Sequence, residues 1–313
     1  MVKLIINEWV KLFKRTSTFV MIGFLILGMI GMGAIYKYLD NQSSPETNEN
    51  WQEELETTIA EDREFLAELQ SSTSYGNLQT YYERDIALNE YRLQNNIAPT
   101  SEQTIWTFVN DATSFISISG IFTIIIAAGI VASEFTSGTI KFLLVRPISR
   151  VKILLSKYIT VILFGLSLLI IVFLFSSLIG ALLFGFPSEE SFHLAYHSGE
   201  VIERNIVFHL ITHYLLYSID ILMIATMAFM ISSVFRNNSL AIGFSLFLFF
   251  SGAAATLLLA EQFDWAKYIL FSNTDLSVYF DGIPQLKDDD NVFYYSLTYI
   301  LFHFPHPRIH SFL

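Results

Sequence analysis

Few residues of this chain have the types and spacing that catalysis or metal binding needs. The chain contains no cysteine, so it has no disulfide, no thiolate ligand and no cysteine nucleophile. His209 and His213 are four residues apart, the spacing with which zinc-binding helices present two ligands. Leu-Ile-Thr stands between them, however, so the H-E-x-x-H pattern is not met. The sequence therefore predicts no catalytic residue and no metal site.

A nucleotide-binding motif is also missing from the sequence. The string G-x-x-x-x-G-K-[ST], whose backbone cradles phosphates, does not occur. We therefore expect that the chain is not an enzyme, that it binds no cofactor of its own, and that any ATP-driven work comes from a partner.

One apolar segment carries a stripe of polar residues on a single helical face. The stripe is His209, His213, Tyr217 and Asp220, at steps of four, four and three. Asp220 lies about halfway along residues 206–235, where a charged group in hydrocarbon costs a few kcal/mol. Two interpretations stay open. His213, Tyr217 and Asp220 line a substrate path, or Asp220 is a protonated or hydrogen-bonded residue that holds helices together.

The composition indicates a multi-pass membrane protein. Of 313 residues, 53% are hydrophobic and only 15% are charged, against roughly 25% charged in soluble domains. A helix that spans a membrane needs about 20 mostly apolar residues. Five stretches qualify: residues 18–39, 113–133, 159–186, 206–235 and 239–260. A sixth begins near residue 292 and stops at residue 304, before Pro305, which is too short to span.

These stretches predict an all-α polytopic membrane protein with five clear spans and a shortened or truncated sixth. The expected divisions are a cytoplasmic interfacial helix (1–17), the first span (18–39), an extracellular helical hairpin (40–112), spans two to five (113–260) with a cytoplasmic loop (134–152), and an outer loop with an incomplete last span (261–313). We expect the first span to be a retained anchor, because its apolar run is too long for a cleavable signal and no A-x-A site follows.

The charges predict which way the chain faces. The net charge is −11, which excludes a generally basic nucleic-acid binder. Eleven of the 18 basic residues are expected on one side: four at the N-terminus, five in the segment between spans two and three, and Arg236 and Arg308. Glu8 and Glu134 are the two acids on that side. Because lysine and arginine favour cytoplasmic loops, we expect a cytoplasmic N-terminus and an extracellular 40–112 segment.

The first 17 residues read as an amphipathic helix in the plane of the membrane surface. Its apolar face carries Leu4, Ile5, Trp9, Leu12 and Phe13, and its polar face carries Lys3, Asn7, Lys11 and Lys14. Such a helix places Trp9 and Phe13 among acyl chains and Lys11 among anionic headgroups.

The 40–112 segment reads as two helical arms. Apolar residues recur near helical spacing over 51–69 and again over 78–93, and turn-forming residues separate the two runs at 71–76. The acids of the first arm form either a solvated face or a surface that attracts a cationic extracellular ligand.

The loop after the second span carries the most specific pattern. Gly138 interrupts the helix and Thr139 is a plausible N-cap for a short new helix. Ile140, Leu143 and Leu144 then form one apolar face, and Pro147 ends the helix. Because two helical turns are marginal alone in water, we expect this helix to be docked on another protein.

At these residues the chain resembles bacterial ABC-2 type transporter permeases. The strings E-F-T-S-G-T-I-K (134–141), L-L (143–144) and R-P-I-S-R (146–150) are similar to the loop after that family's second span. Residues 7–15, N-E-W-V-K-L-F-K-R, are similar to its N-terminal elbow helix. The resemblance covers roughly residues 1–260 and does not extend to the C-terminus, where the family has a complete sixth span. We therefore expect that the chain is truncated or altered in frame there, or that a short re-entrant piece replaces that span.

The resemblance implies a permease in the bacterial plasma membrane. It would pair with a second copy or a sister permease and with cytoplasmic ATPase subunits that bind ATP and Mg. The loop would be the coupling helix, with coupling residues Glu134, Gly138, Thr139, Leu143, Arg146 and Pro147. For Glu134, an ordinary interfacial acid paired with a nearby lysine or arginine is the alternative.

The expected function is therefore the membrane-spanning subunit of an ATP-binding-cassette exporter, moving an amphipathic or apolar substrate such as a peptide, a lipid-linked compound or an ion. The alternative is a non-transporting membrane sensor or anchor that uses the 40–112 hairpin as a receptor. An intramembrane enzyme is disfavoured, because no span carries a matching acid–base pattern.

Overall fold

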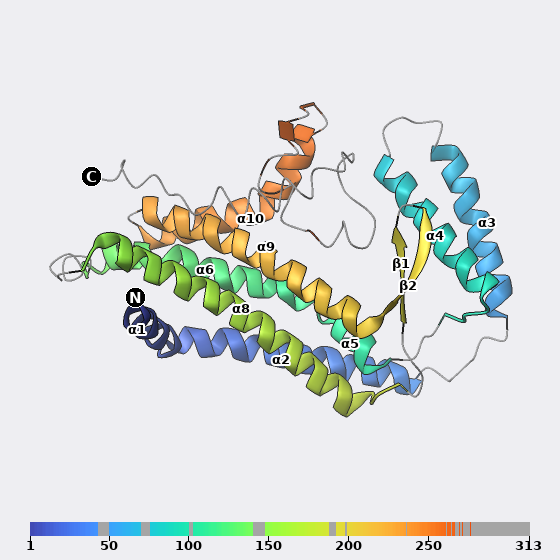
Figure 1. Cartoon of the computed structure of the whole chain (residues 1–313), viewed down its shortest axis with the longest axis horizontal. Coiled ribbons are helices and arrows are strands. Elements are labelled where there is room, and N and C mark those ends of the chain that lie inside the picture. Colours follow the sequence, from blue (N-terminus) through green and yellow to red (C-terminus); the bar gives the residue numbers. More distant parts are fainter. Residues whose placement is uncertain are drawn as a thin grey trace. The chain divides into compact units, whose positions relative to one another are not determined.

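A computed structural model describes residues 1–42, 50–69, 76–99, 103–139, 148–187, 192–197, 199–235 and 237–260, with a few positions up to 276. The elements are α1 (Val2–Phe13), α2 (Thr16–Gln42), α3 (Trp51–Leu69), α4 (Gly76–Gln94), α5 (Ile105–Asp111), α6 (Ser114–Thr136), α8 (Arg150–Leu183), β1 (Phe192–His197), β2 (Glu200–Asn205), α9 (Ile206–Val234) and α10 (Asn238–Ala260) (Figure 1). The expected short helix after Thr139 and the incomplete span at 292–304 lie outside the described residues.

The chain is mostly helical, and five helical segments are long and apolar enough to cross a membrane. They are Thr16–Gln42, Ile105–Thr136, Arg150–Leu183, Ile206–Val234 and Asn238–Ala260. This agrees with the five apolar stretches predicted from the sequence. The second segment begins earlier than residue 113, because α5 precedes α6. Thr104 caps α5: its hydroxyl accepts a hydrogen bond from the Thr107 backbone N–H at 3.3 Å.

The chain divides into two compact units. The first, which we call the helical unit, comprises residues 1–35, 104–186 and 213–274. The second, the hairpin unit, comprises residues 36–103, 187–212 and 275–313. The division falls within α2 and α9, which each contribute to both units.

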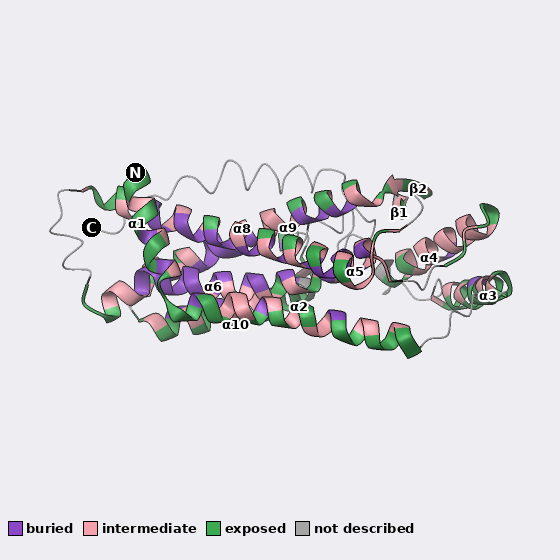
Figure 2. Cartoon of the chain, turned by 90° about the horizontal axis from the view of Figure 1, so that it is seen from below, coloured by how far each residue is buried: buried purple, intermediate pink, exposed green. Residues whose placement is uncertain are grey.

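In the helical unit, α6 lies at the centre. It packs against α8 and α10, while α1 and α5 pack on α8. Figure 2 shows the buried residues concentrated along α6 and α8. The buried face of α6 is rich in small residues, including Gly120, Ala127, Ala128, Gly129 and Ala132, which let neighbouring helices approach closely. From α9, the Ser232 hydroxyl accepts hydrogen bonds from two backbone N–H groups of α6, at 3.1 and 3.2 Å.

At Gly165 of α8, side chains of α6 and α9 lie close to the helix backbone, and replacement of this glycine gives a testable prediction. A Cβ atom at Gly165 would lie 2.6 Å from Ile221 Cγ2 and 3.2 Å from Thr123 Cγ2. We expect Gly165→Ala to destabilise the full chain by about 1–3 kcal/mol, the usual cost of overpacking. Gly23→Ala is the matched control, because a Cβ there meets nothing within 4 Å. Thermal melting in detergent measures both. If Gly165→Ala melts at the same temperature as Gly23→Ala, the close packing around Gly165 is contradicted.

In the hairpin unit, α3 and α4 pack antiparallel. Gln52 Nε2 donates to Asn96 Oδ1 at 2.9 Å near one end, an Arg63–Glu90 ion pair lies in between, and the Phe65 and Tyr82 rings meet near the other end. These helices lie where the sequence predicts two arms. Strands β1 and β2 contact α4, and the Tyr91 hydroxyl donates to Glu203 Oε1 at 3.3 Å.

The prediction of an all-α chain is wrong at residues 192–205. These residues form an antiparallel pair in which Phe192 is opposite Asn205 and His197 is opposite Glu200. The turn between the strands contains Gly199, whose φ of +90° is a conformation that only glycine adopts without strain. Ser-Gly between two short runs was the sequence signal for this hairpin.

Candidate functional site

A buried lysine between two carboxylates is the most concentrated group of charges in the helical unit. Lys157, near the start of α8, has a side chain only 3% exposed. Its ammonium Nζ donates to Glu8 Oε2 at 2.8 Å and to Glu134 Oε1 at 3.0 Å. We call these three residues the lysine clamp. The clamp joins α1, the end of α6 and the start of α8.

The packing of α1 holds Glu8 in the clamp. Leu12, one turn after Glu8, is 4% exposed, and the Thr18 hydroxyl donates to the Leu12 carbonyl at 2.7 Å. The Phe13 ring meets the Phe164 ring of α8 with centroids 6.3 Å apart. The apolar face predicted for the first 17 residues therefore packs in part on α8, and Glu8 lies on that same face.

The three residues predicted for the interfacial helix surround this contact. Trp9 and Phe13 are half-buried, with ring centroids 4.6 Å apart. Lys11 is exposed, and its ammonium donates to the other Glu8 oxygen, Oε1, at 2.9 Å. Lys11 thus pairs with Glu8 within α1, a contact that was not predicted from the sequence.

The end of α6 holds Glu134 in the clamp. Gly138 has a φ of +71°, the left-handed conformation with which a glycine commonly ends a helix. The chain then turns back, so that the Thr139 hydroxyl donates to Glu134 Oε2 and lies 2.9 Å from the Ser137 hydroxyl. Each carboxylate oxygen of Glu134 therefore has a donor, one from Thr139 and one from Lys157. Gly138 and Thr139 were predicted as coupling residues; the structure brings Thr139 into contact with Glu134, and Gly138 forms the turn between them.

The clamp is electrostatically satisfied, although Lys157 and Glu8 are buried and Glu134 is half-buried. The Lys157 ammonium group has three N–H donors, and two carboxylates accept hydrogen bonds from it. The Lys11 ammonium group donates to Glu8 as well, so the charged groups of the clamp have few unmet hydrogen bonds. Burial alone would raise the pKa of Glu8, but the Lys157 and Lys11 ammonium groups outweigh it, so the pKa lies below its ordinary value. Glu8 is therefore a carboxylate at neutral pH.

The lowered pKa predicts a loss of stability in acid. A carboxylate whose pKa is lower in the folded than in the unfolded chain stabilises the fold above the unfolded value, and that contribution disappears as the pH falls through the folded value. We expect the melting temperature to drop as the pH falls from about 5 to about 3. We expect a shallower drop in Glu8→Gln, which has no charge to lose. If the melting temperatures of the wild-type protein and of Glu8→Gln fall by the same amount over this pH range, the pairing of Glu8 is contradicted.

Three further coupling predictions, Leu143, Arg146 and Pro147, lie outside the described residues. For Glu134, the alternative of an acid paired with a lysine matches the Lys157 contact. Neither Glu8 nor Lys157 was singled out from the sequence, where both counted only as charges that orient the chain. One signal was available: Glu8 shares a helical face with Leu4 and Leu12, so it lies on the apolar side.

The four residues of the polar stripe on α9 belong to two different units: His209 to the hairpin unit and the other three to the helical unit. The His209 ring stacks on His193 of β1, with centroids 3.7 Å apart, within the hairpin unit. His213 is 8% exposed and its ring contacts Tyr217 at 5.9 Å, while Asp220 is half-buried. Among the described residues, no group of three or more His, Asp or Glu side chains is arranged to hold a metal ion.

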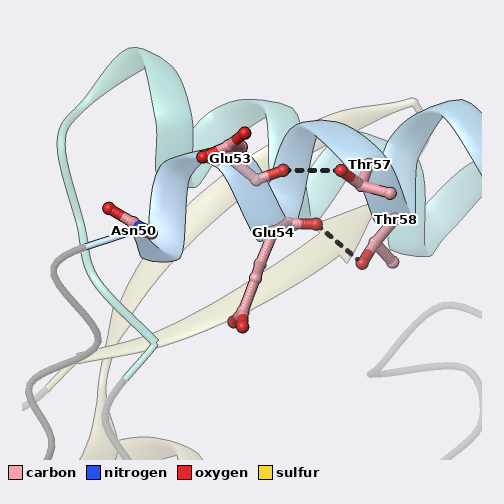
Figure 3. A pocket seen from close by; sticks show the side chains of 5 residues that line it. All are labelled: Asn50, Glu53, Glu54, Thr57 and Thr58. Carbon is pink, nitrogen blue, oxygen red and sulfur yellow. Dashed lines mark hydrogen bonds between the residues drawn. The ribbon is translucent and has the colours of Figure 1, made fainter.

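The acids of the first arm lie on an open surface. Asn50, Glu53, Glu54, Thr57 and Thr58 line a shallow depression on the first turns of α3 (Figure 3). The Thr57 and Thr58 hydroxyls donate to the carbonyls of Glu53 and Glu54 at 2.8 and 3.0 Å, so they are engaged with their own helix. The hydrogens of these two hydroxyls are therefore not available to a ligand.

Comparisons with known proteins place the chain in a family. An uncharacterized protein of Bacillus subtilis (strain 168), YhcI, is 49% identical over 289 residues, which cover 92% of this chain and 90% of YhcI. An uncharacterized membrane protein of the same strain, YdbK, is 34% identical over 167 residues, or 52% of this chain and 63% of YdbK. No solved structure matches the chain. Residues 78–305 match the family described as "Protein of unknown function (DUF2705)", and the chain belongs to this family.

Proposed function

We propose that the chain is the membrane-spanning permease subunit of an ATP-binding-cassette exporter. Three observations support this proposal: the five membrane-length apolar helices, the likeness of residues 7–15 and 134–150 to ABC-2 permeases, and the similarity to YdbK, which is described as a membrane protein. In this proposal, residues 134–150 receive a separate cytoplasmic ATPase subunit.

The lysine clamp is the observation that carries the proposal. Glu134 is the first residue of the loop and Lys157 follows the loop, and their ion pair of 3.0 Å closes the loop at its base. Because the Lys157 side chain is only 3% exposed and that of Glu134 17%, the pair is partly shielded from water and resists separation more strongly than a fully exposed pair does. A push on the loop would then move α6 and α8 together, and Glu8 would carry the same motion to α1.

The remaining parts follow from this assignment. ATP and Mg would bind to the ATPase partner, and this chain would hold no cofactor. A second permease copy or a sister permease would complete the pathway for an amphipathic or apolar substrate. His213, Tyr217 and Asp220 on α9 are the path candidates. The sensor alternative draws on one observation, namely that α3, α4, β1 and β2 belong to a compact unit of their own.

Co-purification tests the proposal. We expect a P-loop ATPase encoded next to this chain's gene to co-purify with the full chain in detergent, and its hydrolysis rate to change on binding. An unrelated ATPase of the same host is the control and should not bind. If no P-loop ATPase of the host binds, the permease assignment is wrong and the result favours the sensor alternative.

The orientation has its own test, which uses the absence of native cysteine. Ala60→Cys on α3 should react with a membrane-impermeant thiol reagent in whole cells, and Lys141→Cys in the loop should not. Lysis should make the second cysteine reactive. Labelling of position 141 alone in intact cells would reverse the proposed topology.

A further inference from the structure

The packed α3–α4 pair carries an exposed cluster of aromatic residues. Phe65 is 39% exposed and Tyr81 45%, and Leu78 beside them is 39% exposed. The Phe65 and Tyr82 rings lie 4.9 Å apart, and the Tyr81 and Tyr82 rings lie 5.6 Å apart and nearly perpendicular. Large exposed side chains that gather at one place on a polar helix pair mark a binding surface more often than chance exposure does.

Two carboxylates flank these rings from the two helices. Asp62 lies one helical turn before Phe65 on α3, and Asp85 lies one turn after Tyr81 on α4. The Tyr81 hydroxyl donates a hydrogen bond to the Asp85 carboxylate. Partial burial and the nearby charges of Asp85 and Glu61 raise the pKa of Asp62, so these carboxylates are close enough to repel one another.

No cation of the chain neutralises this pair among the described residues. Arg63 pairs with Glu90, and neither Asp62 nor Asp85 forms an ion pair. The charge of Asp85 raises the pKa of the Tyr81 hydroxyl more than the charge of Arg84 lowers it, and Arg84 is not within ion-pair distance of either carboxylate. An arriving cation would therefore relieve a repulsion that the folded hairpin unit leaves in place.

The negative charge around the cluster favours a positively charged ligand. Helix α3 carries seven acids and one base, Arg63, so its potential is strongly negative. Aromatic faces attract ammonium and guanidinium groups, and carboxylates bind them through charge-assisted hydrogen bonds. A simple inorganic cation would use the carboxylates without the rings. A ligand that uses both needs positive charges and apolar side chains side by side.

We propose that Phe65, Tyr81 and Tyr82, together with Asp62 and Asp85, form a binding surface for a cationic amphipathic peptide. A lysine or arginine of the peptide lies between the two carboxylates and against a tyrosine face, and its apolar residues cover Phe65 and Leu78. The proposal does not rest on the ATPase partnership, since all of these residues lie in the hairpin unit.

A binding measurement on the full chain tests the surface. The chain is placed in nanodiscs of zwitterionic lipid, and a fluorescent helical peptide of lysine and leucine is titrated and followed by anisotropy, with empty nanodiscs subtracted. Two more probes of equal length, an oligolysine and a glutamate–leucine peptide, separate charge from apolar contact. We expect the lysine–leucine peptide to bind at least about tenfold more tightly than either of them.

Paired variants locate the site. Asp62→Asn with Asp85→Asn should weaken binding about tenfold or more, because two charged contacts are lost. The melting temperature should not fall, since a repulsion is removed, so the loss cannot be ascribed to unfolding. Glu53→Gln with Glu54→Gln removes the same charge at exposed positions of the first turn of α3 and should change binding less than about twofold. Phe65→Ser should also weaken binding.

Each other result overturns the proposal. If both charge pairs weaken binding equally, the whole acidic face attracts the peptide and no site exists at the rings. If oligolysine binds as tightly as the lysine–leucine peptide, the aromatic residues take no part. If the peptide binds no more than it binds to empty nanodiscs, the surface has a different occupant or none.

Discussion

Replacing Lys157 with methionine is expected to destabilise the full chain by about 3–5 kcal/mol, the usual cost of removing one partner from a buried ion pair. The reason is that Glu8 and Glu134 would remain in a poorly solvated place without the ammonium that they share. Methionine keeps most of the side-chain volume, so the change tests charge more than packing. A lower thermal melting temperature in detergent measures the effect.

Lys152→Met is the matched control for this experiment. Lys152 lies on the same helix, but its side chain is exposed, so its loss should change stability by less than about 0.5 kcal/mol. A triple variant, Lys157→Met with Glu8→Gln and Glu134→Gln, should regain much of the lost stability because no charge is left unpaired. If Lys157→Met has the same melting temperature as the wild-type protein, the clamp is not a stabilising contact.

The second large effect is expected from Arg146→Glu in the loop. Under the proposed function, this basic residue faces the ATPase partner, and reversal of its charge should uncouple ATP hydrolysis from transport. We expect the permease-dependent change in hydrolysis rate to disappear while the chain itself melts normally. ATPase assays with the co-purified partner measure the rate.

Lys152→Glu is the control for the loop variant. It makes the same change of charge at an exposed position of α8, after residues 134–150 that resemble the ABC-2 loop, and should leave the ATPase response intact. A normal response in Arg146→Glu would remove the docking role of the loop. Loss of the response in both variants would show that the partner senses overall charge and not this loop.

The apolar helices could be predicted from the sequence because the signal is local. A run of about 20 apolar residues needs no distant partner to be recognised, and the five runs coincide with helices of the structure. The two arms of the hairpin unit follow the same rule, because the period of their apolar residues is set within each helix. The two strands at residues 192–205 were not predicted, because strands of six residues are too short for their periodic pattern to be recognised.

The lysine clamp could not be predicted in the same way. Lys157 and Glu8 are 149 positions apart, and each looks like an ordinary charge near a membrane surface when it is considered alone. Only the packing of α1 on α8, beside the end of α6, removes them from water and makes their pairing necessary. By itself, then, the sequence determined which segments are apolar helices, since that depends on neighbours along the chain. The tertiary structure decided which charges are buried together, because burial depends on residues that are neighbours only in space.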